Sequence, residues 1–366
     1  MNSLKLPIYP NKLLENLDDD NLLDNVILKT NAKTKYITLQ RENNNLSFDN
    51  KYNPSQSSSN LYKIHLQNTF RLIKSFLEEQ GLNSANCVDV GCGKGEFVNL
   101  LNEDSFFNCI GFDTSYEGKN NKIQRRYLNE NDYDPQINLV ILKYVLDYIY
   151  PPNKFLEFLK KIFPNAYIFI EGPYIEDSII NNRFYDICYE QINYFSKESY
   201  LNFFNNKILK SGFTFGNQYF FLISHLKFYN KNSDIDYQAK NLKKINIENI
   251  FPNMKVQLTS LKKIYDESEI LWFWGAARKT VMCIYHFFYN YEKELNLNNF
   301  RCIDQNTSKS GKYLPGTKIK VTTPERIIKK IKINDRIIIS NPFYENEIKN
   351  YLNSKLEFDI KIIILK

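Results

Sequence analysis

The fold is decided by the stretch Cys87-Val88-Asp89-Val90-Gly91-Cys92-Gly93-Lys94-Gly95, because a short apolar strand runs there directly into a glycine-rich turn. A turn of this kind, placed before a helix, lets a ligand approach the backbone and the positive end of the helix. The glycines stand at 91, 93 and 95, whereas a dinucleotide fingerprint needs its third glycine at 96, where this chain has Glu96. The spacing therefore disfavours a nicotinamide-dependent dehydrogenase.

Two acidic residues accompany the turn. Asp113 ends the next predicted strand, 20 positions after Gly93. At that distance a carboxylate can accept both ribose hydroxyl protons. Asp89, before the glycines, suits the cationic amino-acid end of a bound ligand. The turn is therefore predicted to bind a nucleoside with an amino-acid tail.

Strands and helices alternate around this turn. The spacing of apolar residues predicts helices over 61–80, 96–102 and 155–162, and strands over 87–90, 108–112, 126–128, 138–142 and 166–170. Two further strands, 213–219 and 221–228, are expected to form an antiparallel hairpin at one edge. Continuous apolar strands alternating with amphipathic helices indicate a parallel sheet covered on both faces.

A second, smaller alternation follows a helical stretch over 231–268 that is interrupted at Phe251-Pro252. Its expected strands are 270–274, 301–304, 319–321, 336–340 and 358–365, and its expected helices are 276–290, 323–331 and 342–352. The first 60 residues lack sustained periodicity, and 53–60 resembles a loop or lid. We therefore expect an N-terminal segment (1–60), a ligand-binding domain (61–230), a helical connector (231–268) and a second domain (269–366).

Composition excludes several classes of protein. The net charge of +7 is spread along the whole chain without a basic block, so nucleic acid is not an expected partner. No apolar run is long enough for a membrane helix, and no secretion signal follows Met1, so we expect a cytoplasmic protein that does not bind membranes. The six scattered cysteines form no C-x-x-C pair, and no metal site is predicted.

The pattern Asp-x-Gly-x-Gly-x-Gly over 89–95, joined to Asp113, resembles the first two motifs of class I methyltransferases. The resemblance implies a Rossmann-like α/β sheet and S-adenosylmethionine as the cofactor. Its predicted binding residues are Asp89, Gly91, Gly93, Gly95, Asp113, Thr114 and Lys143.

A narrower resemblance lies mainly in the C-terminal third. Residues 271–278 (Leu-Trp-Phe-Trp-Gly-Ala-Ala-Arg), 304–317 (with Lys-Ser-Gly-Lys-Tyr-Leu-Pro-Gly) and 193–196 (Asn-Tyr-Phe-Ser) resemble bacterial nucleotide-sugar C-methyltransferases. The resemblance covers roughly 55–366 and implies that the second, smaller Rossmann-like domain helps to bind a nucleotide-linked sugar. Gly275 opens a helix whose N-terminus can hold a pyrophosphate. The candidate substrate residues are Gly275, Arg278, Lys309, Lys312 and Tyr194.

The chain departs from this family in two places. Residues 1–86 contain no cysteine, whereas the family carries an N-terminal zinc module. The family's Tyr-His-Glu-His segment is Cys188-Tyr189-Glu190-Gln191 here, so both histidines are gone. C-methylation needs a base that removes a proton from carbon, and an imidazole suits that task. O-methylation asks mainly for an oriented hydroxyl and a proton acceptor.

The leading hypothesis is therefore O-methylation of a nucleotide-linked sugar destined for a surface polysaccharide. C-methylation of a keto sugar and a non-catalytic sugar-nucleotide binding protein remain the alternatives, and a homo-oligomer is left open. His225 matches a family strand that faces the sugar and is the candidate imidazole, with Glu190 as base or orienting group and Tyr189 as a sugar contact. His286 is assigned a structural role. His65 matches a family position on the helix before the first strand, and for it a role in the cleft and a role in packing both stay open.

Overall fold

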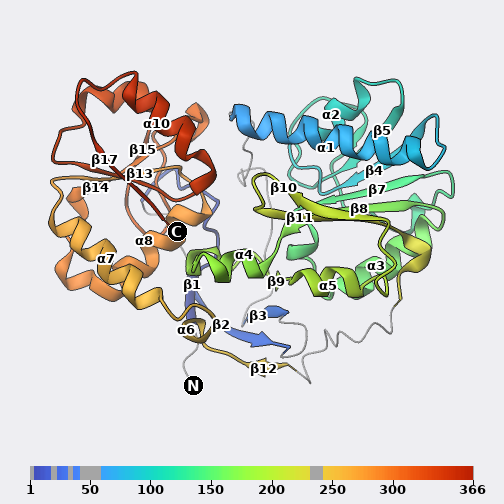
Figure 1. The fold of residues 1–366 in the computed structure, drawn as a ribbon, viewed down its shortest axis with the longest axis horizontal. Helices are drawn as coiled ribbons and strands as arrows, with labels where there is room; N and C mark the ends of the chain where they lie inside the picture. Colours follow the sequence, from blue (N-terminus) through green and yellow to red (C-terminus); the bar gives the residue numbers. More distant parts are fainter. Residues whose placement is uncertain (1–3, 18–22, 32–35, 42–58, 231–241, 366) are drawn as a thin grey trace.

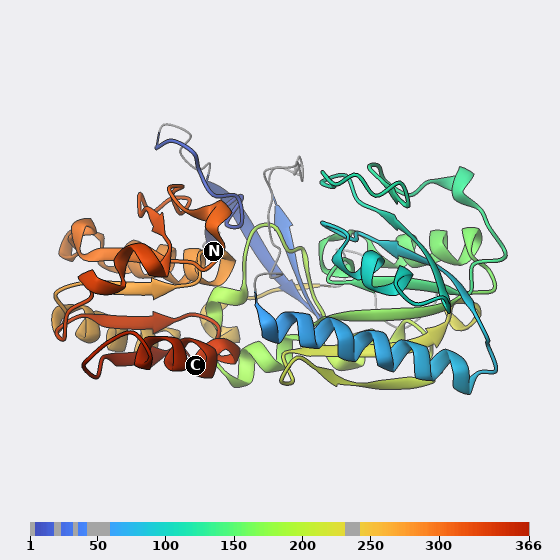
Figure 2. The same cartoon turned by 90° about the horizontal axis from the view of Figure 1, so that it is seen from above.

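The computed structural model describes residues 4–17, 23–31, 36–41, 59–230 and 242–365. Two lobes lie side by side, one built around the glycine turn and one from the C-terminal third of the chain (Figure 1). Small blue strands from the N-terminal region lie between them in both views (Figure 2). Within the described part of the chain, no helix has the length and apolar character needed to cross a bilayer.

The first lobe contains a seven-stranded sheet in the order β10-β11-β8-β7-β4-β5-β6. Its five parallel strands are β4 (Ala85–Val90), β5 (Phe107–Phe112), β6 (Ile123–Gln124), β7 (Leu139–Lys143) and β8 (Tyr167–Pro173). The edge is an antiparallel hairpin of β10 (Lys210–Thr214) and β11 (Tyr219–His225). The predicted parallel sheet with an edge hairpin is confirmed, with boundaries shifted by a few residues.

Helices cover both faces of this sheet. They are α1 (Asn60–Glu79), α2 (Glu96–Asn102), α3 (Pro152–Ile162), α4 (Ile175–Ile180) and α5 (Lys197–Asn202). Ser59 caps α1 by accepting a hydrogen bond from the Tyr62 amide, which satisfies one of the free N–H groups at the helix start. Helix α1 then buries Ile73, Phe76 and Leu77 against the sheet. The sequence analysis predicted neither α4 nor α5.

The second lobe contains a five-stranded sheet in the order β15-β14-β13-β16-β17, with every pair parallel. Its strands are β13 (Leu271–Trp274), β14 (Phe300–Ile303), β15 (Val321–Thr322), β16 (Arg336–Ile339) and β17 (Lys361–Ile364). Its helices are α7 (Met254–Asp266), α8 (Arg278–Tyr291), α9 (Pro324–Ile327) and α10 (Glu345–Asn353). The predicted smaller Rossmann-like domain is confirmed. If the five parallel strands of each sheet are numbered in chain order, both sheets have the strand order 3-2-1-4-5. In the first lobe these strands are β6-β5-β4-β7-β8, and in the second they are β15-β14-β13-β16-β17.

A third, antiparallel sheet corrects the expectation that the N-terminal segment lacks regular structure. It consists of β1 (Leu4–Pro7), β2 (Leu23–Thr30), β3 (Ile37–Arg41), β9 (Asn193–Tyr194) and β12 (Lys243–Lys244). Strand β9 joins it from between α4 and α5 of the first lobe, and β12 begins the connector that continues as α6 (Ile247–Ile250). The predicted loop or lid over 53–60 lies outside the described residues, except for Ser59 and Asn60.

Candidate active site

A cavity of about 910 Å³ lies between the two lobes. The carboxyl ends of β4 and β13 both open into it, each at the point where the strand order of its sheet reverses. In open α/β sheets, ligands bind at this kind of switch point. Gly91, Gly93 and Asp113 line the cavity from one lobe, and Gly275 and Arg278 line it from the other. Both glycine-containing turns singled out in the sequence therefore line the same cavity.

The glycine turn needs its glycines for conformation and for space. Gly91 (φ +72°) and Gly93 (φ +59°) have left-handed backbones that L side chains rarely adopt. A side chain at Gly91 would also collide with Val145. The Gly91 amide donates to the Phe112 carbonyl at 2.7 Å. Gly95 does not line the cavity, because it is the N-cap of α2 and lies against Ile123; its predicted cofactor contact is corrected to a packing role.

Asp113 and Asp89 both face this end of the cavity. Oδ2 of Asp113 accepts from the Gly93 amide at 2.8 Å, and Oδ1 accepts from the amide and the hydroxyl of Ser115, both at 2.7 Å. Burial raises the pKa of Asp89 to about 7, opposed by Lys143 and reinforced by Asp113. Thr114 also lines the cavity. A nucleoside with a cationic tail fits this combination of exposed backbone, acceptor oxygens and buried acid.

Lys143 belongs to a buried polar cluster centred on Glu171. One carboxylate oxygen, Oε1, accepts from Lys143 Nζ at 2.7 Å and from the Tyr144 hydroxyl at 2.5 Å, and lies 3.0 Å from His65 Nε2. The other, Oε2, accepts from the Thr214 hydroxyl at 3.0 Å. Burial alone would raise the pKa of Glu171, but Lys143 and His65 outweigh it and hold that pKa well below its usual range. Glu171 is therefore an ionised carboxylate that fixes the side chains around it.

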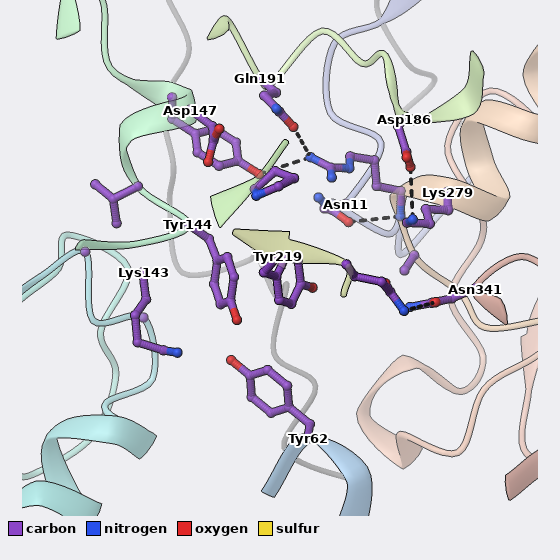
Figure 3. Close-up of a pocket in the computed structure, with 18 of the residues that line it drawn as sticks. Asn11, Tyr62, Lys143, Tyr144, Asp147, Asp186, Gln191, Tyr219, Lys279 and Asn341 are labelled. Carbon is purple, nitrogen blue, oxygen red and sulfur yellow. Dashed lines mark hydrogen bonds and ion pairs between the residues drawn. The ribbon is translucent and has the colours of Figure 1, made fainter. Parts of the chain in front are cut away.

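Tyrosines form the wall of the cavity beside this cluster. Tyr62 of α1 and Tyr144, at the end of β7, point their hydroxyl groups toward each other, and Tyr219 lies beside Tyr144 (Figure 3). Tyr144 has a left-handed backbone (φ +58°), held by the hydrogen bond from its amide to the Glu171 carbonyl at 2.7 Å. Such a conformation in a non-glycine residue costs energy and often marks a functional site. Tyr144 is thus fixed in both backbone and hydroxyl position.

Arg278, the first residue of α8, lines the opposite side of the cavity and is partly buried. Its Nη1 donates to Gln191 Oε1 at 2.9 Å, and it lies 3.3 Å from the Tyr148 hydroxyl and 3.6 Å from Cys188 Sγ. All these partners are uncharged. Among the described residues, Nε and Nη2 of Arg278 have no partner, so the guanidinium retains donors for an anionic ligand.

The second lobe repeats the hydrogen-bond pattern of the first at Asp304. Oδ2 of Asp304 accepts from the Ala276 amide at 2.7 Å, as Asp113 accepts from Gly93, and Oδ1 accepts from the Asn306 amide two residues on at 2.8 Å. Gly275 precedes Ala276 in a left-handed conformation (φ +106°). Lys309 lines the cavity, but its Nζ already binds the Ala276 carbonyl at 2.9 Å and Asp304 at 3.1 Å. Lys309 therefore supports the loop and its charge is partly neutralised.

His225 is not brought to the cavity. It ends β11 opposite Tyr167, the first residue of β8, whereas Pro173 at the other end of β8 lines the cavity. At about 3.3 Å per residue, six residues separate them by roughly 20 Å. His225 Nδ1 accepts from the Lys227 amide, and burial, aided by Lys227, lowers the pKa of His225 to about 4. The predicted catalytic role of His225 is corrected for this reason.

Glu190 and Tyr189 face the N-terminal sheet rather than the cavity. Both carboxylate oxygens of Glu190 accept from Asn11, and the Tyr189 hydroxyl donates to Asp24 at 2.6 Å. Neither residue lines the cavity, so their predicted roles as base and sugar contact are corrected as well. Lys312 is also outside the cavity and pairs with Glu15 at 2.9 Å.

Tyr194, predicted to bind substrate, lines the cavity, and its hydroxyl is held by the backbone of Cys188. The sequence analysis missed Tyr62, Tyr144 and Asp147, although the last two directly follow the strand predicted over 138–142. The carboxyl ends of parallel strands meet at one edge of a sheet, and that rule could have singled them out. In the described part of the chain, no three His, Cys, Asp or Glu side chains come together as metal ligands.

The fold and the turn define a class I methyltransferase domain. Residues 62–207 match the family model described as a methyltransferase domain. Residues 62–207 therefore form a methyltransferase domain with S-adenosylmethionine as its cofactor. No curated protein matches its sequence.

Solved structures resemble parts of the chain. A SAM-dependent methyltransferase from Aquifex aeolicus is 19% identical, with a TM-score of 0.33, over 42% of this chain and 88% of that one. The Burkholderia thailandensis 1,6-didemethyltoxoflavin-N1-methyltransferase, solved with 1,6-didemethyltoxoflavin and S-adenosylhomocysteine, is 9% identical, with a TM-score of 0.35, over 54% of this chain and 98% of that one. Nothing about the acceptor follows from likenesses of this size.

Replacing Asp113 by alanine is expected to raise the Kd for S-adenosylmethionine at least about tenfold, equivalent to about 1.4 kcal/mol. The change removes the acceptor for ribose hydroxyls and the anchor of the Gly93 amide. Isothermal titration calorimetry measures the constant, with Asp266→Ala, which alters an exposed residue at the end of α7, as the control. An unchanged Kd would mean that the ribose contact is misplaced.

Proposed function

We propose that the protein transfers a methyl group from S-adenosylmethionine to a hydroxyl group of a nucleotide-linked sugar. The cofactor lies on the Gly91–Gly93 turn in this proposal, and the sugar nucleotide spans the cavity toward α8. Bound at the turn, S-adenosylmethionine supplies an electrophilic methyl group. The residues of the chain bind and orient the acceptor and keep water away from the reaction.

The main support for the proposal is the position of Arg278 in the cavity and the lack of charge on its hydrogen-bond partners. A guanidinium that lines a cavity with only neutral partners favours an anionic ligand, and its planar donors match phosphate oxygens. The positive end of helix α8 adds to this preference. Its N-cap residue, Ala277, provides no side-chain cap, and the Arg278 amide donates to Asn11 Oδ1 at 3.0 Å. Two other cations nearby, Arg183 and Lys279, are already paired with Asp186. The unsatisfied positive charge is therefore concentrated at Arg278.

The repeated pattern at Asp304 supports the nucleotide part of the proposal. Asp113 and Asp304 hold equivalent positions after the second strand of sheets with the same strand order, and each accepts from the loop after the first strand. One of these loops serves a nucleoside in the cofactor domain. The same arrangement in the second lobe suits the nucleotide of a second ligand.

Transfer to oxygen is favoured over transfer to carbon. Among the described residues that line the cavity there is no histidine, and Gln191, in place of the family's second histidine, accepts a hydrogen bond from Arg278. Tyr62, Tyr144, Tyr148 and Tyr219 instead offer hydroxyl groups and ring faces that suit a sugar. A base strong enough to remove a proton from carbon is a greater demand than a group that accepts a hydroxyl proton during attack.

A panel of sugar nucleotides incubated with isotopically labelled S-adenosylmethionine tests the proposal by mass spectrometry. We expect one labelled methyl group on a sugar nucleotide, with an O-methyl signal in the product NMR spectrum. A methyl group on quaternary carbon, or exchange of solvent deuterium beside a ketone, would contradict O-methylation. Labelled methyl groups on none of the sugar nucleotides would contradict the proposal as a whole.

A further inference from the structure

Asp147 is a buried acid in the cavity wall that the sequence analysis did not single out. It lies in the short helical turn Leu146–Tyr148 after β7, and only 1% of it is exposed. It lines the cavity together with Tyr148 and Gln191. Figure 3 places Asp147 and Gln191 on the same side of the cavity, beyond Tyr144. Asp147 therefore lies where the cofactor lobe meets the acceptor half of the site.

The carboxylate of Asp147 is incompletely satisfied. Oδ1 accepts one long hydrogen bond, from the Tyr200 hydroxyl at 3.4 Å. Among the described residues, Oδ2 has no hydrogen-bond partner. A Cβ on Gly172 would lie 3.0 Å from Oδ2, so the glycine leaves the room that this oxygen occupies. A buried carboxylate with a free acceptor is costly unless a ligand supplies the missing donor.

Most of the other buried acids around the cavity already have hydrogen-bond or ion-pair partners. Glu171 accepts from four side chains, and Asp186 is paired with Arg183 and Lys279. Asp113 and Asp304 are bound by backbone amides. Asp89 faces the cofactor turn and its neighbour Lys143. The Tyr144 hydroxyl donates to Glu171, so it holds its proton. Among the described residues, Asp147 and Asp89 are thus the buried acids of the cavity with open acceptors, and of the two Asp89 lies at the cofactor turn, whereas Asp147 lies toward the acceptor half.

We propose that Asp147 is the general base that accepts the proton of the sugar hydroxyl during methyl transfer. The inference rests on the proposed function. As the acceptor oxygen forms its bond to the methyl carbon, the carbon–sulfur bond of the cofactor breaks and its electron pair stays on sulfur. The hydroxyl proton moves to Oδ2 of Asp147. The step starts from a sulfonium and a carboxylate and ends with a neutral thioether, a methyl ether and a carboxylic acid, so charge balances.

The ionisation of Asp147 suits this role. Burial raises the pKa of Asp147 to about 7, whereas Arg278, at the start of α8, and Tyr200, in α5, act in the opposite direction. The group is therefore close to half-ionised at neutral pH, where a general base is most effective. Below about pH 7 it becomes protonated and cannot accept a proton. The rate is expected to fall as pH decreases through this value.

Asp147→Asn, an almost isosteric change, tests the proposal. We expect kcat to fall at least about 100-fold, the lower end of a general-base contribution. The Kd for S-adenosylmethionine and the melting temperature should stay close to the wild type, which shows that the variant folds. The pKa of Asp89, at the cofactor turn, is also about 7. The dependence of kcat on pH is therefore measured at saturating S-adenosylmethionine, so that a change in cofactor binding does not affect the rate. The acidic limb of the wild-type profile should be absent in the residual activity of the variant.

Tyr200→Phe supplies the matched variant. Since the Tyr200 hydroxyl lowers the pKa of Asp147, its removal should move the acidic limb to higher pH and leave the plateau of kcat nearly unchanged. A merely structural Asp147 would give no such displacement. Infrared difference spectra of the protein without acceptor, with isotope-labelled aspartate, provide a readout that needs no turnover. They should contain a carboxyl component that titrates near pH 7 and is lost in Asp147→Asn, whereas the component from Asp89, whose pKa is also about 7, should remain in both proteins.

The possible outcomes distinguish a failure of the role proposed for Asp147 from a failure of the proposed function. If the wild type methylates a sugar nucleotide while Asp147→Asn keeps kcat within threefold, or keeps the acidic limb, Asp147 is not the base and the proposed function stands. If the wild type methylates no sugar nucleotide, the proposed function fails and the inference falls with it. Loss of kcat together with loss of the limb and the infrared band supports both.

Discussion

An Arg278→Met enzyme is expected to need roughly 100-fold more sugar nucleotide for half-maximal rate, equivalent to about 2.7 kcal/mol, with an unchanged Kd for S-adenosylmethionine. Among the described residues, the guanidinium hydrogen-bonds only Gln191, Tyr148 and Cys188, so a phosphate group would be its first anionic hydrogen-bond partner. Charged hydrogen bonds in a partly desolvated site are among the stronger single contacts in recognition. The loss should therefore appear in the KM for the acceptor.

Lys312→Met is the matched control for this change. Lys312 was also predicted to bind substrate, but it pairs with Glu15 outside the cavity. We expect its KM to stay within twofold of the wild type. Arg278→Lys should be intermediate, because it keeps the charge and loses the planar fork. Equal KM values for Arg278→Met and the wild type would remove the main support for a phosphorylated acceptor.

Glu171→Gln is expected to lower the free energy of unfolding by about 3–5 kcal/mol, the usual cost of removing one partner from a buried ion pair. Lys143 would be left buried without its carboxylate, and Tyr144 and His65 would lose their common acceptor. Urea unfolding followed by circular dichroism measures the change. Glu130→Gln, in an exposed pair with Lys161, should unfold like the wild type.

The pH dependence of this effect has a definite sign. The pKa of Glu171 is held below its ordinary value of 4.5, so the ionised cluster stabilises the fold fully above that pH. The contribution is lost as pH falls below about 4.5. The stability difference between wild type and variant should therefore shrink in acid. Adding Lys143→Met to Glu171→Gln should recover part of the loss, and no recovery would mean that Lys143 is not the charge that Glu171 compensates.

Much of the fold follows from local patterns in the sequence. The apolar strands of both parallel sheets are continuous runs such as 139–142 and 336–339, and glycines with left-handed backbones mark the turns that follow β4 and β13. Strands β1, β2 and β3 pair with their neighbours in sequence, and only β3 pairs with β9, about 155 residues away. The strands escaped prediction because their patterns are short, and the distant pairing with β9 leaves no local signal.

The candidate site was predicted unevenly for a similar reason. Cofactor-side residues follow from the turn and strand order, which are local. The catalytic assignment depended on which end of β11 faces the cavity. In the structure β11 runs antiparallel to β8, so its last residue, His225, lies away from the carboxyl ends of the parallel strands. The predicted hairpin left open which of its two strands joins the sheet, so this direction did not follow from the sequence. The direction of Glu190 depends on Asn11 and could not be predicted either.

The N-terminal sheet has a consequence for how the chain folds. The Tyr285 hydroxyl donates to the carbonyl of Lys5, and Leu14 bridges to Tyr313, so this segment binds to residues that are synthesised 280 or more positions later. A ribosome-bound chain can complete the parallel sheet around β4 long before these partners exist. Contacts of such large sequence separation form slowly. These N-terminal residues are thus made well before the partners that hold them in place.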